Sequence, residues 1–354
     1  MVNIPFLSKS SDGNSLGIDI GTASLKIVEI SGEKEPNLEN YGEIFMRDFA
    51  GEAPVKGVKG SLAYSSEEIA EALKHLLKEA GIKTKKVYFS IPDFVSFFTS
   101  FKIPAMKEEE VKSSIEFHSR QYIPLPISEV SLDWFLEDGK EGEERKVNLI
   151  AVPNDVIDQY REIAQLSGVE IVSLEGEMFA LVRALARNNE VCTAIVDIGE
   201  QSTLLTIAEK GKLKTTHSLE VAGNMLVKQV AKAAEIEYNE ARKVIMAHGV
   251  EEESIRRAAA SSLSSLFSEV SRVIEVFEKE EGGNINEIII AGGFSLLPGV
   301  LEYAEESLDK KAIRKNCFEG ISYPDILKYE LERISNSHSI ALGVALSKIG
   351  KNGN

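Results

Sequence analysis

The sequence predicts an α/β protein made of two related halves, and three segments support this prediction. The segment LGIDIGTASLK at 16–26 joins an apolar strand, an aspartate and a turn glycine to a second apolar run. The same pattern returns in AIVDIGEQST at 194–203. A third segment, EIIIAGGFSLLPG at 287–299, follows an apolar strand with a glycine pair. The repeated pattern indicates two halves of common architecture, whose acidic turns can face each other across a cleft.

The first turn has the residues that an anion site needs. Residues 16–19 are too short and too apolar for a surface helix, so they predict a buried strand with the carboxylate of Asp19 at its tip. Gly21 lets the chain turn sharply and lets backbone N–H groups approach an anion. Small residues and a lysine follow: Thr22, Ala23, Ser24 and Lys26. Taken alone, these residues also describe an ordinary β-hairpin; the second copy favours the anion site.

Composition limits the possible functions. The chain has 354 residues, enough for two domains, with 27% charged and 43% hydrophobic residues, as in ordinary globular proteins. Its formal net charge of −16 argues against nucleic acid as a main partner and against adhesion to anionic membranes. Cys192 and Cys317 have no spacing typical of a metal site or disulfide framework. The sequence contains neither an apolar run of membrane-spanning length nor a signal peptide, so we expect a cytoplasmic protein.

The first elements follow from periodicity and from helix-capping residues. We expect residues 1–15 to form a frayed tail, or a small docking anchor around 4–7. A capping box of Ser65 and Glu68 begins a helix that Gly81 ends. The strands expected around this helix are 16–30, as a hairpin, then 41–46 and 87–91.

The pattern changes at Phe94, where a compact β-α-β-β-α insertion is expected. A strand rich in phenylalanine is followed by a helix with apolar residues at helical spacing, which YIPLP at 122–126 interrupts. Asn154 is expected to cap the last helix of the insertion. The predicted elements are the strands 95–103, 130–136 and 146–152, the helices 107–122 and 156–167, and a returning strand at 170–174.

The second half begins with a helix at 175–187 that links the halves. A strand at 212–218 and helices from Gly223 and Asn239 follow. Residues 251–281 predict one long helix or a broken pair, with one apolar face. The last helix, 339–349, contains the small residues Ala341 and Gly343, which allow close packing.

Together the three motif segments resemble the phosphate-one, phosphate-two and adenosine motifs of the actin, sugar-kinase and heat-shock ATPase superfamily. The resemblance implies an actin-like, ribonuclease H-like fold that binds ATP or ADP with Mg²⁺ between its halves. Asp19 and Asp197 would hold Mg²⁺ through water, which suits a cation that keeps its hydration shell. The implied phosphate ligands are Gly21, Thr22, Ala23, Ser24, Lys26, Gly199, Ser202 and Thr203. The implied nucleoside ligands are Gly223, Asn224, Glu240, Lys243, Gly292, Gly293 and Phe294.

The chain departs from this superfamily pattern in ways that bear on catalysis. Glu177 is the candidate to orient an attacking water, but Met178 stands where relatives often have proline. Glu177 can equally be a carboxylate that complements the start of a helix. Glu200 and Gln201 replace glycines of the second turn, and Glu200 brings negative charge near the phosphates. We therefore expect a slow ATPase at most, with ATP binding favoured over rapid hydrolysis.

The insertion identifies a narrower resemblance. Residues 116–134, EFHSRQYIPLPISEVSLDW, resemble the PilM family of type IV pilus assembly proteins, with Leu125 where phenylalanine is more usual. That family shares with FtsA an actin-like core carrying a relocated subdomain, 1C. The resemblance implies a partner, the cytoplasmic N-terminal peptide of a PilN-like inner-membrane protein, bound between 1A and 1C. Candidate contacts are Tyr122, Ile123, Leu125 and Trp134, which equally fit core packing.

The resemblance also implies a domain plan: 1–93 as 1A, 94–168 as 1C, 169–190 as a return to 1A, 191–222 with 284–324 as 2A, 223–283 as 2B, and 325–354 as a connecting helix. The expected function is a nucleotide-binding scaffold of a pilus, secretion or competence platform, reaching the membrane indirectly through its partner and contacting other platform or motor proteins. Two alternatives stay open. One is an FtsA-like filament-forming division protein, although no amphipathic membrane helix follows the last helix, and the other is a small-molecule kinase.

Overall fold

The computed structural model describes residues 13–32, 34–51, 62–137, 143–187 and 190–348. The chain forms two compact units, Met1–Glu29 with Asn40–Glu177, and Ile30–Glu39 with Met178–Asn354. The possible tail or anchor at the N-terminus and the tip of the loop at 137–145 lie outside the described residues. Among the described helices, none is both long and apolar enough to cross a membrane.

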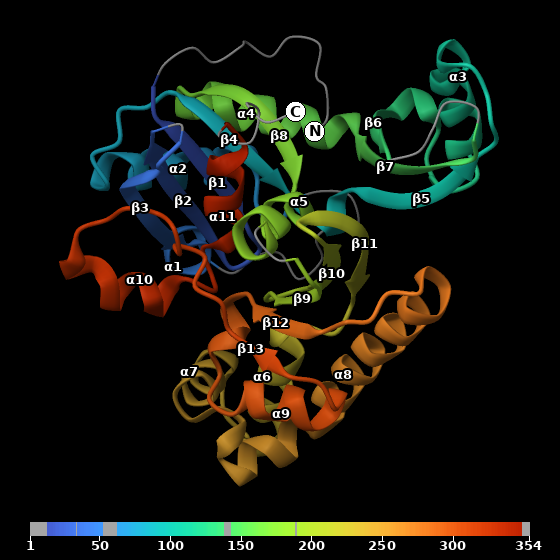
Figure 1. Cartoon of the computed structure of the whole chain (residues 1–354). Helices are drawn as coiled ribbons and strands as arrows, with labels where there is room; N and C mark the ends of the chain where they lie inside the picture. Colours follow the sequence, from blue (N-terminus) through green and yellow to red (C-terminus); the bar gives the residue numbers. More distant parts are fainter. Residues whose placement is uncertain (1–12, 33, 52–61, 138–142, 188–189, 349–354) are drawn as a thin grey trace. The chain divides into compact units, whose positions relative to one another are not determined.

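The first unit is built on a five-stranded sheet of order β3-β2-β1-β4-β8 (Figure 1). β1 and β4 pair in parallel, with Leu16 opposite Val87, and β4 pairs in parallel with β8. Every residue of β1 is buried, as expected for an apolar strand covered on both faces. The strands are β1 (Ser15–Ile20), β2 (Ser24–Ser31), β3 (Asn37–Phe45), β4 (Lys86–Ile91) and β8 (Glu170–Gly176).

Helices α2 (Ser66–Glu79) and α4 (Asn154–Ser167) pack against each other in this unit (Figure 1). The capping box predicted for α2 is confirmed, since Ser65 and Glu68 exchange side-chain and backbone hydrogen bonds. Tyr160 of α4 meets the ring of Phe89 on β4 edge to face, with centroids 5.3 Å apart. This contact attaches α4 to the sheet. The short α1 (Met46–Ala50) follows β3.

A separate three-stranded antiparallel sheet of order β5-β7-β6 forms within the predicted insertion. The helix expected to end the insertion, α4, packs instead against α2 and β4 of the first sheet. Its elements are β5 (Phe97–Ile103), α3 (Glu108–Ser119), β6 (Val130–Leu136) and β7 (Arg145–Pro153). The predicted cap at Asn154 is wrong, because Pro153 occupies the N-cap position of α4. The side chain of Asn154 instead accepts from the Ser131 hydroxyl and donates to the Ser128 carbonyl, which fastens β6 to α4.

The second unit repeats the strand arrangement of the first. Its sheet has the order β11-β10-β9-β12-β13, with β9, β10 and β11 antiparallel and β12 parallel to β9. The strand order thus matches that of the first sheet, position for position, which confirms two halves of common architecture. The strands are β9 (Cys192–Ile198), β10 (Thr203–Glu209), β11 (Lys212–Leu219), β12 (Glu287–Ala291) and β13 (Ala312–Ile313).

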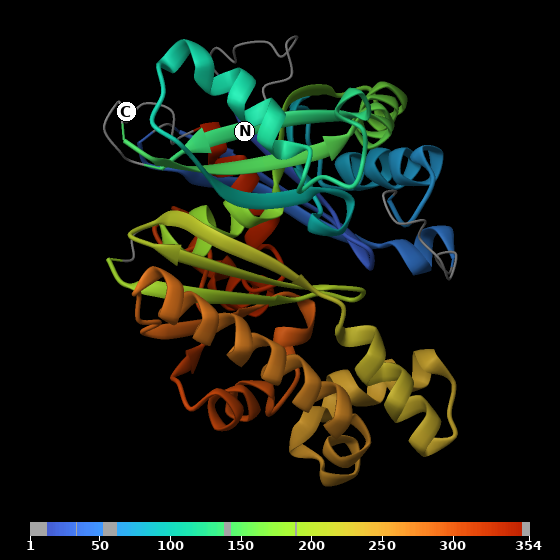
Figure 2. The same ribbon diagram turned by 90° about the vertical axis from the view of Figure 1, so that its right-hand side faces the viewer.

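Helices cover the second sheet, and α8 (Glu253–Glu281) runs along one face of it (Figure 2). Its apolar side chains form one core with β9, β10 and β12 and with the helices α6 (Gly223–Ala234), α7 (Tyr238–His248) and α9 (Val300–Leu308). One continuous helix, Glu253–Glu281, therefore follows a short 3₁₀ turn at Gly249–Glu251.

The linking helix is shorter than expected: α5 (Glu177–Leu181) continues as a π-helical turn, Val182–Ala186. In the second unit this turn packs against α11 (Ser339–Ala345), where a Cβ on Gly343 would lie 2.1 Å from the carbonyl oxygen of Ala180. The guanidinium of Arg183 donates to the Gly343 carbonyl over 2.7 Å. A glycine is required at this contact because the backbones approach so closely. The remaining helix is α10 (Lys328–Ile334).

Candidate functional site

A backbone hydrogen bond closes the turn between β1 and β2. The amide of Gly21 donates to the carbonyl of Ser24 over 3.1 Å, and a Cβ on Gly21 would lie 3.0 Å from that oxygen. Glycine is therefore favoured sterically here. Thr22 and Ala23 follow in the turn and are partly exposed. Gly21, Thr22 and Ala23 are thus the residues of this turn that reach the surface.

Asp19 lies at the end of β1 with 4% of its surface exposed. Its Oδ1 accepts from the Ser90 hydroxyl over 2.8 Å, and its Oδ2 lies 3.9 Å from the Lys26 ammonium. Burial raises the pKa of Asp19, while Lys26 and Ser90 oppose that rise. The carboxylate is thus poorly solvated and incompletely compensated, an arrangement suited to a further cation.

Lys26 is shared between two carboxylates. Its ammonium lies 3.8 Å from Oε1 of Glu43 on β3, and the same oxygen accepts from the Ser24 hydroxyl over 2.6 Å. The Ser24 hydroxyl is therefore committed to Glu43, and the Ser24 carbonyl is committed to the Gly21 amide. Sequence reasoning missed Glu43, because nothing local in its strand signals that it reaches the first turn.

Glu177 lies at the boundary between β8 and α5. Its Oε1 accepts from the amide of Asp93 over 2.9 Å, so this carboxylate oxygen stabilises the turn after β4. Tyr160 donates its hydroxyl to the Ser90 carbonyl over 2.7 Å, and burial followed by the charges of Asp19 and Glu177 raises its pKa well above the ordinary value. Asp19 and Glu177 thus influence the same buried tyrosine, which places both acids in one region of the first unit.

The turn between β9 and β10 reproduces the first turn closely. The amide of Gly199 donates to the carbonyl of Ser202 over 3.0 Å, and a Cβ on Gly199 would lie 2.9 Å from that oxygen. Asp197 precedes this turn as Asp19 precedes the first, and it is partly exposed. Each unit therefore carries one aspartate and one glycine turn of the same geometry.

Thr203 requires a correction to the predicted set of phosphate ligands. The residue is fully buried, and its hydroxyl donates to the Val221 carbonyl over 2.7 Å. A hydroxyl has one proton to donate, and a phosphate oxygen needs a donor. Ser202, which is partly exposed, is the hydroxyl of this turn that remains for a ligand.

The glycine pair after β12 lies directly beside Asp197. Gly292 has a φ of 87°, and a Cβ on it would lie 2.6 Å from Oδ1 of Asp197 and 2.5 Å from the Ile198 carbonyl oxygen. Gly292 is thus required by both its conformation and its neighbours. Gly293 is exposed, and a Cβ on it would meet no described atom within 4 Å. The surface at Gly293 is open enough for a flat group.

Phe294 is the second correction, because it does not line an open surface. It has 2% exposure and belongs to the core of the second unit. A Cβ on Gly223 would lie 2.2 Å from its ring, so the ring occupies the space that the absent side chain leaves. Gly223 and Phe294 therefore contact each other as packing partners, and the ring is not presented to a nucleoside.

Helices α6 and α7 meet the second turn. Gly223 and Asn224 donate their amides to the carbonyls of Gly199 and Glu200 over 3.0 and 2.9 Å. Glu240 and Lys243 are exposed on α7. The carboxylate of Glu200 lies against α7, where it contacts Tyr238 and Arg242. Sequence reasoning missed these two partners because the contact depends on how α7 packs.

The partner-peptide candidates lie in the three-stranded insertion. Ile123 is buried in its core, and Leu125 and Trp134 pack partly buried against that core. Tyr122 is 43% exposed and stacks on Phe101, with ring centroids 5.1 Å apart. Tyr122 is therefore the candidate with the most surface left for a partner.

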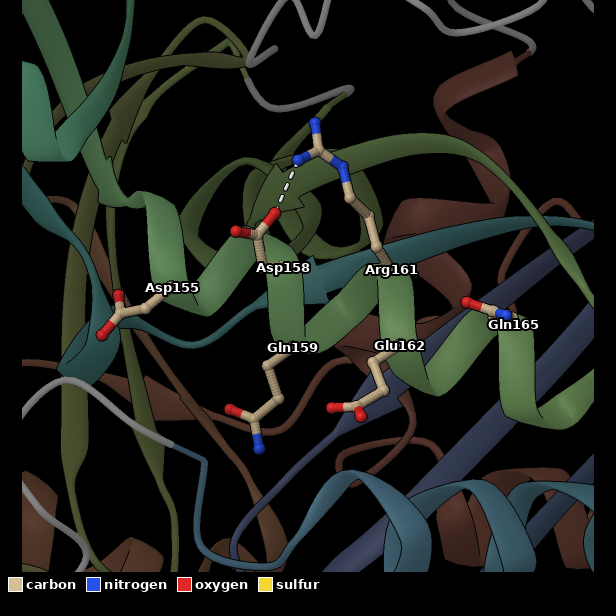
Figure 3. Close-up of a pocket in the computed structure, with 6 residues that line it drawn as sticks. All are labelled: Asp155, Asp158, Gln159, Arg161, Glu162 and Gln165. Atoms are coloured by element: carbon tan, nitrogen blue, oxygen red, sulfur yellow. Dashed lines mark hydrogen bonds and ion pairs between the residues drawn. The ribbon is translucent and has the colours of Figure 1, made fainter.

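A surface recess along α4 carries no comparable chemistry (Figure 3). Its lining comes from one helix, where Asp158 pairs with Arg161 and Gln159 binds the backbone of Leu62 and Tyr64. The lining residues are Asp155, Asp158, Gln159, Arg161, Glu162 and Gln165. Across the part of the chain that the structure describes, no cluster of three His, Cys, Asp or Glu residues could hold a metal unaided.

Comparisons with known proteins agree on the fold. The cell division protein FtsA of Streptococcus pneumoniae is 21% identical over 349 residues, covering 83% of this chain and 74% of FtsA. A structure described as a PilM-PilN type IV pilus biogenesis complex matches with a TM-score of 0.83 and 24% identity, over 95% of this chain and 98% of that one. MreB 5 of Spiroplasma citri bound to AMPPNP matches with a TM-score of 0.51 and 15% identity, over 92% and 98%.

These matches show that the chain has the actin-like fold. A family model for the type IV pilus assembly protein PilM matches residues 17–349, nearly the whole chain. The chain therefore belongs to the PilM family of type IV pilus assembly proteins.

Proposed function

We propose that this chain is a nucleotide-binding scaffold of a type IV pilus or related inner-membrane assembly platform. The observation that carries the proposal is the agreement, over 95% of the chain, with a structure of a PilM-PilN complex. By analogy, a PilN-like membrane protein would hold the scaffold at the cytoplasmic face of the membrane through its N-terminal peptide. The peptide would bind between 1A and 1C, beside Tyr122, which is 43% exposed.

The two matching turns support nucleotide binding. Each turn is closed by the amide of its own glycine, Gly21 or Gly199, so a phosphate would meet the partly exposed residues beside them, Thr22, Ala23 and Ser202. The buried Asp19 is also short of compensating charge. Asp19 and Asp197 would hold Mg²⁺ through its water shell, and the cation would neutralise phosphate charge. The exposed Gly293 would lie under the nucleoside. MreB 5 bound to AMPPNP is an example of this fold with a nucleotide.

Slow turnover fits this proposal better than fast catalysis. Glu177 is the candidate to orient water, and one of its carboxylate oxygens already accepts from the Asp93 amide.

In the domain plan, 1A (1–93 and 169–190) and 2A (191–222 and 284–324) would carry the two turns. Subdomains 1C (94–168) and 2B (223–283) would be accessory, and 325–354 would form the connecting helix. The scaffold would use nucleotide as a structural or switching ligand.

A peptide experiment tests the scaffold function. A synthetic peptide of the Asn-Leu-Leu-Pro type, which represents a PilN-like cytoplasmic N-terminus, should bind the full chain in a fluorescence anisotropy titration. A scrambled peptide of identical composition is the control. Equal binding of both peptides would contradict the proposal, and titration of MgATP by calorimetry tests the nucleotide site separately.

The match to FtsA favours a second candidate function, assembly into filaments through copies of the chain. Light scattering and electron microscopy of the purified chain with MgATP test it. Nucleotide-dependent filaments would favour this candidate, whereas a monodisperse species under all conditions would contradict it.

A further inference from the structure

Glu200 stands in the second turn, and its side chain lies against α7. One carboxylate oxygen accepts from the Tyr238 hydroxyl over 2.5 Å, and the other lies 3.6 Å from Nε of Arg242. Tyr238 and Arg242 are four residues apart on α7, so they lie on the same helix face. The Glu200 side chain is 10% exposed. Two side chains of one helix face therefore hold this carboxylate.

The backbone of Glu200 is held as well. Its carbonyl accepts from the Asn224 amide over 2.9 Å, while the neighbouring Gly199 carbonyl accepts from the Gly223 amide over 3.0 Å. The turn is thus attached to α6 through its main chain and to α7 through its side chain. These contacts fix the carboxylate on the α7 side of the turn.

The charges decide what this arrangement does. A buried carboxylate is costly to desolvate unless a cation and hydrogen bonds compensate it. An uncompensated Glu200 would also repel any phosphate bound at Gly199 and Ser202. Because the Glu200 side chain is only 10% exposed, salt would screen this repulsion only weakly. Arg242 supplies one positive charge, so the pair carries no net charge beside the turn.

We propose that Arg242 is a positioning residue that neutralises Glu200 and, with Tyr238, directs it toward α7, and thereby sets the affinity of the second turn for nucleotide phosphates. The inference rests on the proposed nucleotide-binding function and deepens it. A turn that has a glutamate in place of glycine remains compatible with an anion because α7 provides the compensating cation. The affinity for phosphate then depends on helix α7 as well as on the turn.

Calorimetric titrations with MgATP at low salt test this through the sign of two effects. R242Q leaves a bare carboxylate beside the phosphates and should weaken ATP binding on the order of tenfold. E200Q keeps an acceptor for Tyr238, removes the negative charge beside the turn, and should strengthen ATP binding by a similar factor. Adenosine, which carries no phosphate, should bind all three proteins equally.

Further variants separate charge from folding. R242K keeps the positive charge and should stay within about threefold of the original chain. The double variant E200Q/R242Q should return close to the original affinity, as its two charge changes cancel. K232Q removes the charge of an exposed lysine in the last turn of α6 and is the matched control. Circular dichroism checks that each variant is folded.

Two results would overturn the inference: E200Q and R242Q shifting ATP affinity in the same direction, or either one changing adenosine binding as much as ATP binding. Either result would mean that the contact between Glu200 and Arg242 has only a structural role. If the original chain does not bind MgATP at all, the proposed nucleotide function fails first, and that outcome is read directly from the first titration.

Discussion

The Ser90 hydroxyl donates a 2.8 Å hydrogen bond to Oδ1 of Asp19, joining the carboxyl ends of two parallel strands. The Ser90 carbonyl in turn accepts from Tyr160 of α4. The aspartate proposed to hold magnesium is thus positioned by the sheet and by the helix behind it. Such support limits the motion of the carboxylate, which is what a precise binding site requires.

D19N should stabilise the ligand-free protein at neutral pH. Burial raises the pKa of Asp19 above its ordinary value of 3.8, so the folded state binds a proton more tightly than the unfolded state. Stability from this group is therefore full at pH values below 3.8 and is lost as pH rises through the raised pKa. Asparagine does not ionise and should add about 1 kcal/mol at pH 7, measured by urea unfolding.

The pH profile is the control for this variant. The stability difference between D19N and the original chain should shrink as pH falls through the raised pKa of Asp19 and should vanish below the ordinary value of 3.8, where both the folded and the unfolded states are protonated. In the presence of MgATP the original chain should be more stable than D19N, because MgATP stabilises the chain that keeps the aspartate. A lower stability of D19N at every pH would contradict the account of Asp19 as a strained, functional carboxylate.

Substitutions at Thr203 and Ser202 should have separate effects, the first on folding stability and the second on ATP affinity. T203V removes the buried donor to the Val221 carbonyl and should cost about 1 kcal/mol of unfolding free energy with unchanged ATP affinity. S202A removes a partly exposed hydroxyl and should weaken ATP binding several-fold with little change in stability. Urea unfolding and calorimetry measure the two quantities. Loss of ATP binding in T203V at full stability would reverse the assignment.

Two glycines near the proposed nucleoside surface should respond differently to alanine. A Cβ on Gly223 would lie 2.2 Å from the Phe294 ring, so G223A should lose about 2–3 kcal/mol of stability. A Cβ on Gly293 meets nothing within 4 Å, so G293A should stay within about 0.5 kcal/mol and should instead weaken nucleotide binding. Thermal unfolding with and without MgATP compares them. Equal destabilisation by both would contradict the packing of Gly223 against Phe294.

The paired turns could be predicted from sequence, whereas the partners of their side chains could not. An aspartate two residues before a glycine, after an apolar strand, specifies the hairpin of Gly21 and that of Gly199 through local chemistry alone. The resemblance of its segment to the adenosine motif implies that Phe294 is a nucleoside ligand. Its ring lies in the core because Gly223, far away in sequence, leaves room for it. Contacts of that kind depend on tertiary packing, which overrides local pattern.

Substitutions at Tyr122 and Ile123 should separate an effect on partner-peptide affinity from an effect on folding stability. Y122A removes a side chain that is 43% exposed and stacked on Phe101, so it should cost about 1 kcal/mol and weaken binding of the PilN-type peptide. I123A empties a core position of the three-stranded insertion and should cost about 2–5 kcal/mol. Anisotropy titrations and urea unfolding report the two effects. Unchanged peptide affinity in Y122A would remove this residue from the proposed contact.

The two cysteines should report unfolding through their reactivity. Burial, the main cause for both thiols, raises the pKa of Cys192 to about 11 and that of Cys317 to about 12. The thiolate is the reactive form, and at pH 8 it amounts to about one molecule in a thousand for Cys192 and fewer for Cys317. Both side chains are also buried.

A thiol reagent such as Ellman's should therefore label the native chain slowly, and both cysteines should become labelled at the urea unfolding transition. C192S and C317S assign the two signals. Rapid labelling of either cysteine at pH 8 without denaturant would mean that its part of the second unit opens far below the global unfolding free energy.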